Sequence, residues 1–336
     1  MAKKTSGQGK SAAARKARRA KRRRRKIILV CVEFLVLGAA LLWIWANAKM
    51  DKINTDKSFK AKDVRNEDLS KETRDVLGGY TTIALFGLDN RDNNSYNSGN
   101  SDVIMVARID NKTKEVRLVS VYRDTFLKMA DLDNTDAYSK ANAAYAMGGP
   151  EQAVRMLNTN LDLDIQEYVA FDFSAVAEAV DILGGVEIEI TDEECGHLNN
   201  YCVETSEVTG KSYEPLPGGG TYNLNGVQAV SYGRIRYTAG DDFKRTERQR
   251  LVVNKMVEKA LKSDIGTING LIDAVFPKIR TSLGADELVK MAASALQYKL
   301  GESRGFPFDL QNEVVSIAYQ QSNSDCVIPK DLASNV

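Results

Sequence analysis

Arginine is concentrated in one short segment of the sequence. Residues 233–250 read GRIRYTAGDDFKRTERQR and contain five arginines, one lysine, two adjacent aspartates and one glutamate. A guanidinium group can make two charge-assisted hydrogen bonds to a phosphate at once, and it keeps its charge at neutral pH. The segment therefore predicts either a binding site for an anion such as a phosphate, or a wet surface on which the arginines pair with neighbouring acids.

The second half of this segment has helical spacing. Steps of three and four residues place on one face Asp242, Arg245, Gln249, Val252, Val253, Met256 and Ala260. The apolar end of this face must pack inward, and a buried arginine without a partner is costly. The charged end therefore either reaches the surface or lines a polar cleft that holds anions. Arg234 and Arg236 come just before it, at the end of another expected helix.

Further charged residues follow three predicted strands. Runs rich in β-branched residues between positions 80 and 122 predict a three-strand meander. Asp89 follows the first strand, Asp102 precedes the second, and Arg123 and Asp124 follow the third. Because consecutive strands run in opposite directions, these residues would meet at one edge of the sheet.

Two carboxylates without a neighbouring histidine or thiolate suit a hard divalent cation. Mg²⁺, with Mn²⁺ as the alternative, takes oxygen ligands and completes its shell with water and substrate phosphate. The spacing alone is compatible with such an ion at Asp89 and Asp102, and equally with turn capping by Asp89, Asn90, Asp102 and Asp124. A pyrophosphate bridged by this metal would suit four nearby arginines: Arg123, Arg234, Arg236 and Arg245. The sequence has neither GxxxxGK[ST] nor GxGxxG after a strand, which argues against P-loop and dinucleotide sites.

The order of the predicted elements is typical of an α/β fold. The meander is followed by helical patterns over residues 139–148 and 150–161, a strand over 168–173, a helix over 173–185 and a strand over 186–191. A Gly/Pro-rich segment then leads into a mostly helical part. The later expected elements are helices over residues 242–262 and 286–298 and a closing strand over 313–319.

The N-terminal region predicts a membrane anchor. Residues 27–46 form a 20-residue apolar run with one charge, which is long enough for a helix to cross a bilayer. Residues 1–26 contain 13 Lys or Arg and no acid, so the positive-inside rule leaves this basic tail in the cytoplasm. Residues 47–79 are expected to form a juxtamembrane spacer, and residues 80–336 a single extracytoplasmic domain.

The charge balance also limits the partners. Without the tail, 33 basic residues face 45 acidic ones, so the body is acidic. The basic tail is expected to contact membrane lipid rather than nucleic acid, because no aromatic residues interleave its charges.

Cysteine and histidine give few options for catalysis. Cys195, Cys202 and Cys326 lie in the exported part, where one disulfide with one cysteine left over is permitted, and the sequence leaves the pairing open. The single histidine, His197, is expected in a loop over residues 191–221. A zinc site or a Ser-His-Asp arrangement would depend on that residue alone, so neither is expected.

An ordered set of motifs resembles the LytR-CpsA-Psr family of cell-wall proteins over residues 80–262. The matching blocks are FGLDNR from Phe86, SD at Ser101, YRDT from Tyr122, SKANAAY from Ser139, FDF from Phe171, DILGGVEIEI from Asp181, LNGVQAVSYGRIRY from Leu224 and DDFKRTERQR from Asp241. Any single block is weak, but their shared order is specific. Asn90 stands where many members have serine, and residues 191–221 do not align.

The resemblance implies a fold, an activity and a set of site residues. The expected fold is a three-layer α/β/α sandwich around a mixed central sheet, with an apolar cleft for a lipid. The expected activity transfers a glycopolymer, such as a teichoic acid or capsular polysaccharide, from a polyprenyl pyrophosphate carrier to peptidoglycan through a phosphodiester. The implied metal ligands are Asp89 and Asp102, and the implied pyrophosphate-binding residues are Arg91, Arg123, Lys140, Arg234, Arg236, Arg245 and Gln249.

Catalysis by such a site would rest on charge and position. Arg123, Asp242 and Arg245 are the expected catalytic residues, acting during in-line attack of a glycan hydroxyl on phosphorus. The base stays open among Asp89, Asp124 and Asp242. Two other functions also stay open at this point: a phosphohydrolase that releases the linked group to water, and a non-catalytic lipid-binding or regulatory membrane protein.

Overall fold

The computed structural model describes residues 52, 54–88, 96, 99–129, 137–236, 241–284, 287–288, 290–291, 294, 297–317 and 322–336. The predicted basic tail and membrane helix lie outside these residues, as do Asp89, Asn90 and Arg91. Within the described ranges, no helix combines the length and the apolar character needed to cross a membrane.

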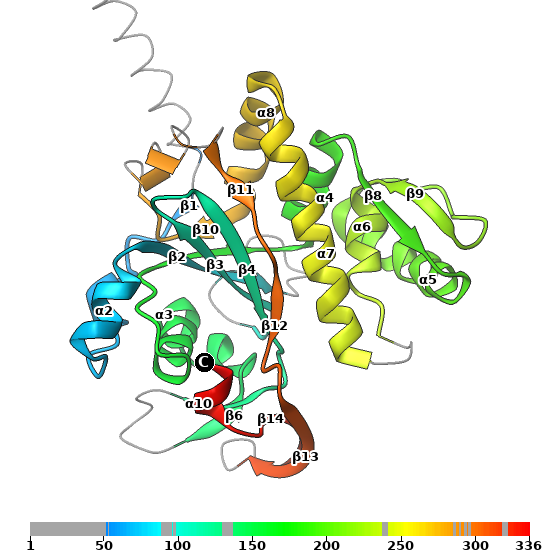
Figure 1. Ribbon diagram of the computed structural model, residues 1–336. Helices are drawn as coiled ribbons and strands as arrows, with labels where there is room; N and C mark the ends of the chain where they lie inside the picture. Colours follow the sequence, from blue (N-terminus) through cyan, green and yellow to red (C-terminus); the bar gives the residue numbers. More distant parts are fainter. Residues whose placement is uncertain are drawn as a thin grey trace, which may run out of the picture. The chain divides into compact units, whose positions relative to one another are not determined.

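A mixed β-sheet runs through the body formed by Lys52–Val336 (Figure 1). Among the described residues it has eight strands in the order β1-β10-β7-β2-β3-β4-β11, with β12 also pairing with β4. The strands are β1 Asn54–Thr55, β2 Tyr80–Leu88, β3 Ser101–Asp110, β4 Glu115–Val121, β7 Glu167–Phe171, β10 Ile279–Thr281, β11 Lys299–Leu300 and β12 Arg304–Phe306. β3 pairs in antiparallel fashion with both β2 and β4, and β7 pairs with β2 in parallel. The predicted meander is therefore confirmed.

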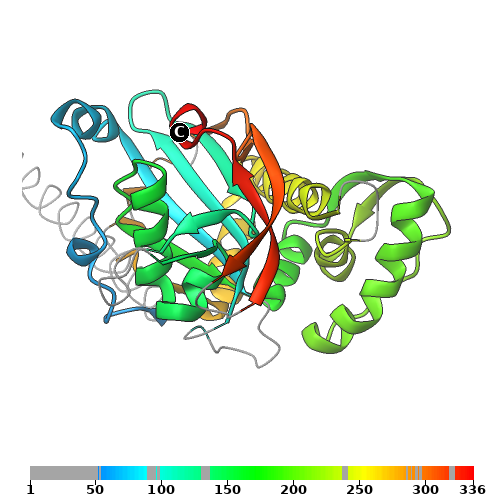
Figure 2. The same ribbon diagram turned by 90° about the horizontal axis from the view of Figure 1, so that it is seen from below.

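Helices cover both faces of this sheet, which gives the expected three layers (Figure 1). One face packs against α3, and the other lies beneath α4, α7 and α8. The helices are α2 Lys71–Leu77, α3 Ala143–Asn160, α4 Phe173–Ile182, α5 Asp192–Thr209, α6 Gly226–Tyr232, α7 Asp241–Lys262, α8 Ile265–Val275 and α10 Leu332–Asn335. Figure 2 shows α5 and α6 set to the side of the sheet.

Aromatic packing joins the sheet to α3. Phe86 of β2 lies with its ring centroid 5.4 Å from that of Tyr145 in α3 and 6.5 Å from that of Tyr168 in β7. α3 is kinked at Gly149, whose φ of +64° suits glycine, directly before Pro150. The two helical patterns expected on either side of this point thus form one interrupted helix.

The prediction of a loop over residues 191–221 is wrong. Most of it is α5, which begins with a reciprocal capping box between Thr191 and Glu194. His197, Cys195 and Cys202 lie on this helix. Cys195, Cys202 and Cys326 are buried free thiols, so the structure contains none of the permitted disulfides among them.

Among the described residues, three two-stranded antiparallel sheets lie outside the central sheet. The strand expected at residues 186–191 is β8 Val186–Ile190, and it pairs with β9 Gly220–Leu224. The expected closing strand is part of a hairpin of β13 Leu310–Ile317 with β14 Ser322–Pro329. β5 Phe126–Lys128 pairs with β6 Tyr138–Lys140. Of the helix expected over 286–298, residues 287–288 and 290–291 are described and helical.

The segment before Tyr80 is packed more closely than a spacer would be. β1 pairs with β10, and the side chain of Val64 is fully buried. The Asn158 amide of α3 donates a 2.7 Å hydrogen bond to the Val64 carbonyl. The folded body therefore begins earlier than the composition of residues 47–79 indicates.

Candidate functional site

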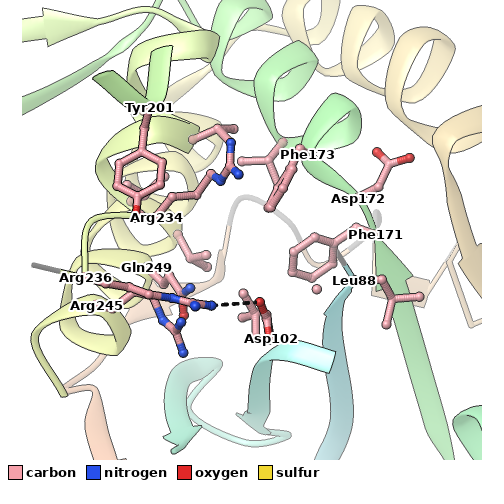
Figure 3. A pocket seen from close by; sticks show the side chains of 18 of the residues that line it. Leu88, Asp102, Phe171, Asp172, Phe173, Tyr201, Arg234, Arg236, Arg245 and Gln249 are labelled. Carbon is pink, nitrogen blue, oxygen red and sulfur yellow. Dashed lines mark hydrogen bonds and ion pairs between the residues drawn. The ribbon is translucent and has the colours of Figure 1, made fainter. Parts of the chain in front are cut away.

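A cavity of about 270 Å³ lies between one edge of the sheet and helices α4, α6 and α7 (Figure 3). Its walls combine an apolar part and a charged end. The apolar lining includes Phe171, Phe173, Val176, Val230, Val252 and Val253. The charged and polar lining includes Asp102, Glu204, Arg234, Arg236, Arg245 and Gln249. Such a cavity suits a ligand with an apolar chain and an anionic head.

Local sequence explains how the cavity is walled. Asp172 begins α4 as its N-cap, accepting a 2.8 Å hydrogen bond from the backbone N–H of Ala175, so Phe171 and Phe173 flank the start of this helix. α6 can approach α4 closely because it begins at Gly226, where a Cβ atom would collide with the backbone of Ala177.

Ion pairs join the sheet edge to α7 at the charged end. Arg123, two residues beyond the end of β4, donates from Nη1 to Asp102 Oδ1 at 2.8 Å and from Nε to Asp242 Oδ2 at 3.0 Å. Arg245 Nη2 lies 3.1 Å from Asp242 Oδ1. The backbone of this edge is fixed by Asn142, whose N–H donates to the Arg123 carbonyl at 3.0 Å. The expected meeting of Arg123 with Asp102 and with the start of α7 is confirmed.

Arg245 is the most unusual side chain of the site. It is 2% exposed, and its three guanidinium nitrogens have no hydrogen-bond partner among the described residues, because the close approach to Asp242 lacks hydrogen-bond geometry. Burial, followed by the positive charge of Arg123, lowers the pKa of Arg245 to about 10. The group remains charged at neutral pH, and its donors lie at the cavity wall together with Arg236 (Figure 3).

The acids beside Arg123 have pKa values shifted in opposite directions. Burial, and then a hydrogen bond with Asp242, raises the pKa of Asp124. Burial acts against ionisation of Asp242 as well, but the hydrogen bond from Asp124 and the charges of the two arginines outweigh it and lower its pKa to about 2. Asp124 also pairs with Lys140 at 2.9 Å, which brings this predicted residue into the same network.

The remaining predicted residues line the cavity in different ways. Arg236 Nη2 lies 3.4 Å from Asp102 Oδ2, as drawn in Figure 3. Gln249 is one turn beyond Arg245 on α7. Arg234 instead turns toward α5, donating to Glu204 Oε2 at 2.7 Å and to Thr205 Oγ1 at 2.9 Å.

Sequence reasoning missed the α5 side of the cavity. The Arg234 guanidinium lies 4.8 Å from the ring centroid of Phe173 and 5.3 Å from that of Tyr201, which also lines the cavity. Tyr201 and Glu204 lie in the segment for which the sequence predicts a loop, so they are not among the predicted site residues. The available signal was the Thr191-x-x-Glu194 capping pattern, which indicates the start of a helix.

The structure describes only one of the two predicted metal ligands. Asp102 stands at the cavity wall, and both its oxygens face guanidinium groups. Asp89 lies outside the described residues, as does Arg91. Within the part of the chain that is described, no three His, Cys, Asp or Glu side chains gather as metal ligands.

Comparison with known proteins gives consistent matches along most of the chain. The model of the LytR_cpsA_psr family matches residues 44–325. A protein of Enterococcus faecalis named polyisoprenyl-teichoic acid--peptidoglycan teichoic acid transferase TagU is 30% identical over 79% of this chain and 79% of its own. Biofilm regulatory protein A of Streptococcus mutans is 31% identical over 66% of this chain, which spans 53% of that protein.

Solved structures share the fold. Protein gbs0355 from Streptococcus agalactiae matches with a TM-score of 0.60 and 24% identity, covering 79% of this chain and 88% of that one. TagV of B. subtilis matches with a TM-score of 0.56 and 22% identity, covering 76% of this chain and 92% of that one. These likenesses agree with the mixed sheet and its two helical layers.

Proposed function

The chain belongs to the LytR_cpsA_psr family, and we propose that it transfers a glycopolymer from a polyisoprenyl diphosphate carrier to peptidoglycan. The observation that carries this proposal is Arg245, a charged and buried guanidinium without a hydrogen-bond partner at one end of an apolar cavity. A diphosphate would supply the acceptors that these donors lack, and an isoprenoid chain would match the apolar walls. The name of the Enterococcus faecalis relative describes the same class of substrate.

In the proposed reaction, an acceptor hydroxyl attacks the sugar-side phosphorus of the diphosphate. A bond forms between that oxygen and phosphorus, the bond from this phosphorus to the bridging oxygen breaks, and polyisoprenyl phosphate leaves. Arg123, Arg236 and Arg245 stabilise the negative charge on the transferring oxygens. Such charge-directed catalysis needs no histidine or covalent intermediate.

The hydroxyl proton needs an acceptor near the arginines. Asp124 and Asp242 are hydrogen-bonded to each other beside Arg123, and opposite shifts of their pKa values keep one of them ionised. We propose that this pair of carboxylates accepts the proton of the attacking hydroxyl. Lys140 holds Asp124 in place through its ion pair of 2.9 Å.

We further propose that a divalent cation, Mg²⁺ or Mn²⁺, binds at this site. Asp102 would hold it together with Asp89, and the ion would neutralise charge on the diphosphate oxygens. The location of Asp102 beside the arginines supports this assignment. Chelation by EDTA should abolish transfer, and addition of Mg²⁺ or Mn²⁺ should restore it. Full activity in EDTA would show that transfer does not require a divalent cation.

The location proposed for the protein is a membrane, crossed once by residues 27–46, with the basic tail inside and the folded body outside. The apolar run and the asymmetry of positive charge support this topology. Protease added to intact cells should degrade the body and leave the tail protected.

The proposed function is tested by supplying the purified full chain with a polyisoprenyl diphosphate-linked glycan and peptidoglycan. We expect glycan attached to peptidoglycan through a phosphodiester, together with one polyisoprenyl phosphate for each glycan transferred. Release of glycan phosphate to water at a higher rate than transfer would instead identify a phosphohydrolase. Binding of the lipid without either product would indicate a non-catalytic protein.

A further inference from the structure

α8 is rich in apolar residues, yet none of its side chains is buried. Its sequence is IGTINGLIDAV, with Asp273 as the only charged residue. Ile265 at the turn between α7 and α8 is 86% exposed. Removing a large aliphatic side chain from water gives about 1.5–3 kcal/mol, so several such side chains left partly in water indicate a surface that another apolar phase covers.

The start of the folded body is tied to this helix. Lys52 Nζ forms a 2.8 Å ion pair with Asp273 Oδ1 of α8. β1 pairs in parallel with β10, the strand that follows α8. The predicted membrane helix ends at residue 46, and six further residues can span at most about 20 Å. A membrane anchor at residues 27–46, as proposed above, would therefore limit how far Lys52, and with it α8, can lie from the bilayer surface.

The charge around α8 also suits a membrane. The body as a whole is acidic, but residues 255–278 carry four lysines against three acids. All three acids are engaged: Asp264 accepts a 2.9 Å hydrogen bond from the backbone N–H of Thr267, Asp273 pairs with Lys52, and Glu258 pairs with Lys262 at 2.7 Å. Of the lysines, Lys278 also pairs with Glu178 at 2.9 Å. Lysines beside an apolar helix can place their stems along the apolar region and their ammonium groups at lipid phosphates.

From these observations we infer that α8 and the α7–α8 turn dock on the lipid bilayer that carries the anchor. The inference rests on the proposed function only for the membrane anchor, and it does not depend on the transfer reaction. Ile265 enters the headgroup region, and α8 lies along the interface as an amphipathic segment.

The docking has a consequence for the substrate. α7 carries Arg245 near one end and Lys262 at the other. These two residues are 17 positions apart in sequence, which corresponds to about 25 Å at 1.5 Å per residue. With its far end on the bilayer, α7 holds the diphosphate site away from the lipid surface, so the carrier's isoprenoid chain must extend out of the membrane to reach it.

Depth-dependent quenching tests the docking. The full chain, in a Cys31→Ser background, carries an environment-sensitive fluorophore at Ile265→Cys and is reconstituted into vesicles of phosphatidylcholine and phosphatidylglycerol. Val314→Cys on β13 is the matched control, because this side chain is also aliphatic and is 67% exposed. The three remaining cysteines are buried and are not expected to react.

We expect spin-labelled lipid to quench the Ile265 probe at least twofold more than the Val314 probe. Equal quenching in vesicles that retain the chain would overturn the docking while leaving the proposed function intact. Energy transfer between Ile265 probes of different chains, without quenching by lipid, would assign the surface to a second copy and also overturn it. A chain that fails to float with the vesicles would contradict the anchor and the docking together.

Discussion

Two buried arginines of α7, Arg245 and Arg248, lie within one helical turn and have opposite surroundings. Arg245 is 2% exposed and has no hydrogen-bond partner in the part of the chain that the structure describes. Arg248 is 5% exposed, donates to Glu194 Oε1 at 2.8 Å and to the Ile235 carbonyl at 3.2 Å, and lies 5.8 Å from the ring centroid of Tyr232.

The difference indicates two roles: a structural one for Arg248 and, as proposed, an anion-binding one for Arg245. Arg248 joins α7 to the N-terminus of α5 and to the segment after α6, and its donors meet a carboxylate and a carbonyl. Arg245 lies instead beside Arg123 and Arg236, whose positive charges lower its pKa further after burial. Such an arrangement opposes folding and favours binding of an anion, which is typical of functional sites. Burial alone does not distinguish the two roles; the partners do.

Of the substitutions considered, replacing Arg245 should have the largest effect, and this effect should be on the rate of glycopolymer transfer. We expect Arg245→Ala to reduce the transfer rate by 10²- to 10³-fold, about 2.7–4 kcal/mol, which is the effect of removing one donor to a transition state. The free energy of unfolding should change by less than about 1 kcal/mol, because loss of the ion pair with Asp242 is offset by removal of a buried charge that opposes folding. Single-turnover transfer and urea unfolding measure the two quantities. Undiminished transfer would remove Arg245 from the site.

Replacing Arg248 should have the opposite signature. Arg248→Ala leaves Glu194 partly buried without its ion-pair partner, so the unfolding free energy should fall by about 3 kcal/mol. Transfer per folded molecule should stay near that of the unsubstituted chain. The double variant Arg248→Ala, Glu194→Gln should recover part of the stability. A stable Arg248→Ala chain with lost transfer would reverse the assignment of the two arginines.

Acid should weaken the pairing around Arg245 in a defined pH range. The pKa of Asp242 is lowered from 3.8 to about 2, so its ionised form contributes stability above pH 3.8 that is lost as the pH falls through about 2. Asp242→Asn should therefore lower the unfolding free energy by about 2 kcal/mol at pH 7 and by much less at pH 2. Urea unfolding at a series of pH values checks this. A difference independent of pH would mean that Asp242 acts through packing rather than charge.

The smallest effect is expected at Lys244, which precedes Arg245 on the same helix. Lys244 pairs with Glu247 at 2.8 Å on the exposed face of α7. Because water screens this pair, Lys244→Ala should change the unfolding free energy by no more than about 0.5 kcal/mol and leave transfer unchanged. Thermal unfolding and the transfer assay measure both. A large loss of either would show that the surface of α7 matters beyond its two buried arginines.

The parts of the site that depend on local sequence were predictable. β2 spans the expected residues because its β-branched and aromatic run ends at a polar segment. An antiparallel meander returns each strand to the edge where the previous one began, so Asp102 and Arg123 had to meet. The face of α7 followed from its spacing of three and four residues.

The parts that depend on long-range packing were not predictable in the same way. The hydrophobic pattern of α5 is sparse, consisting mainly of Cys195, Leu198 and Cys202 among polar residues. Its helical state depends on packing against α6 as well as on its capping box. Periodicity could also not separate Arg245 from Arg248, because both are buried on α7 and only the tertiary partner of each defines its role.

The most direct test of the central claim is binding of a short isoprenoid diphosphate to the full chain. Calorimetry with farnesyl pyrophosphate, at a temperature where each variant is folded, compares the unsubstituted protein with Arg245→Ala and Arg248→Ala. We predict equal affinity for the unsubstituted protein and Arg248→Ala, and at least tenfold weaker binding by Arg245→Ala. Equal binding by all three proteins would contradict the claim that Arg245 holds the diphosphate.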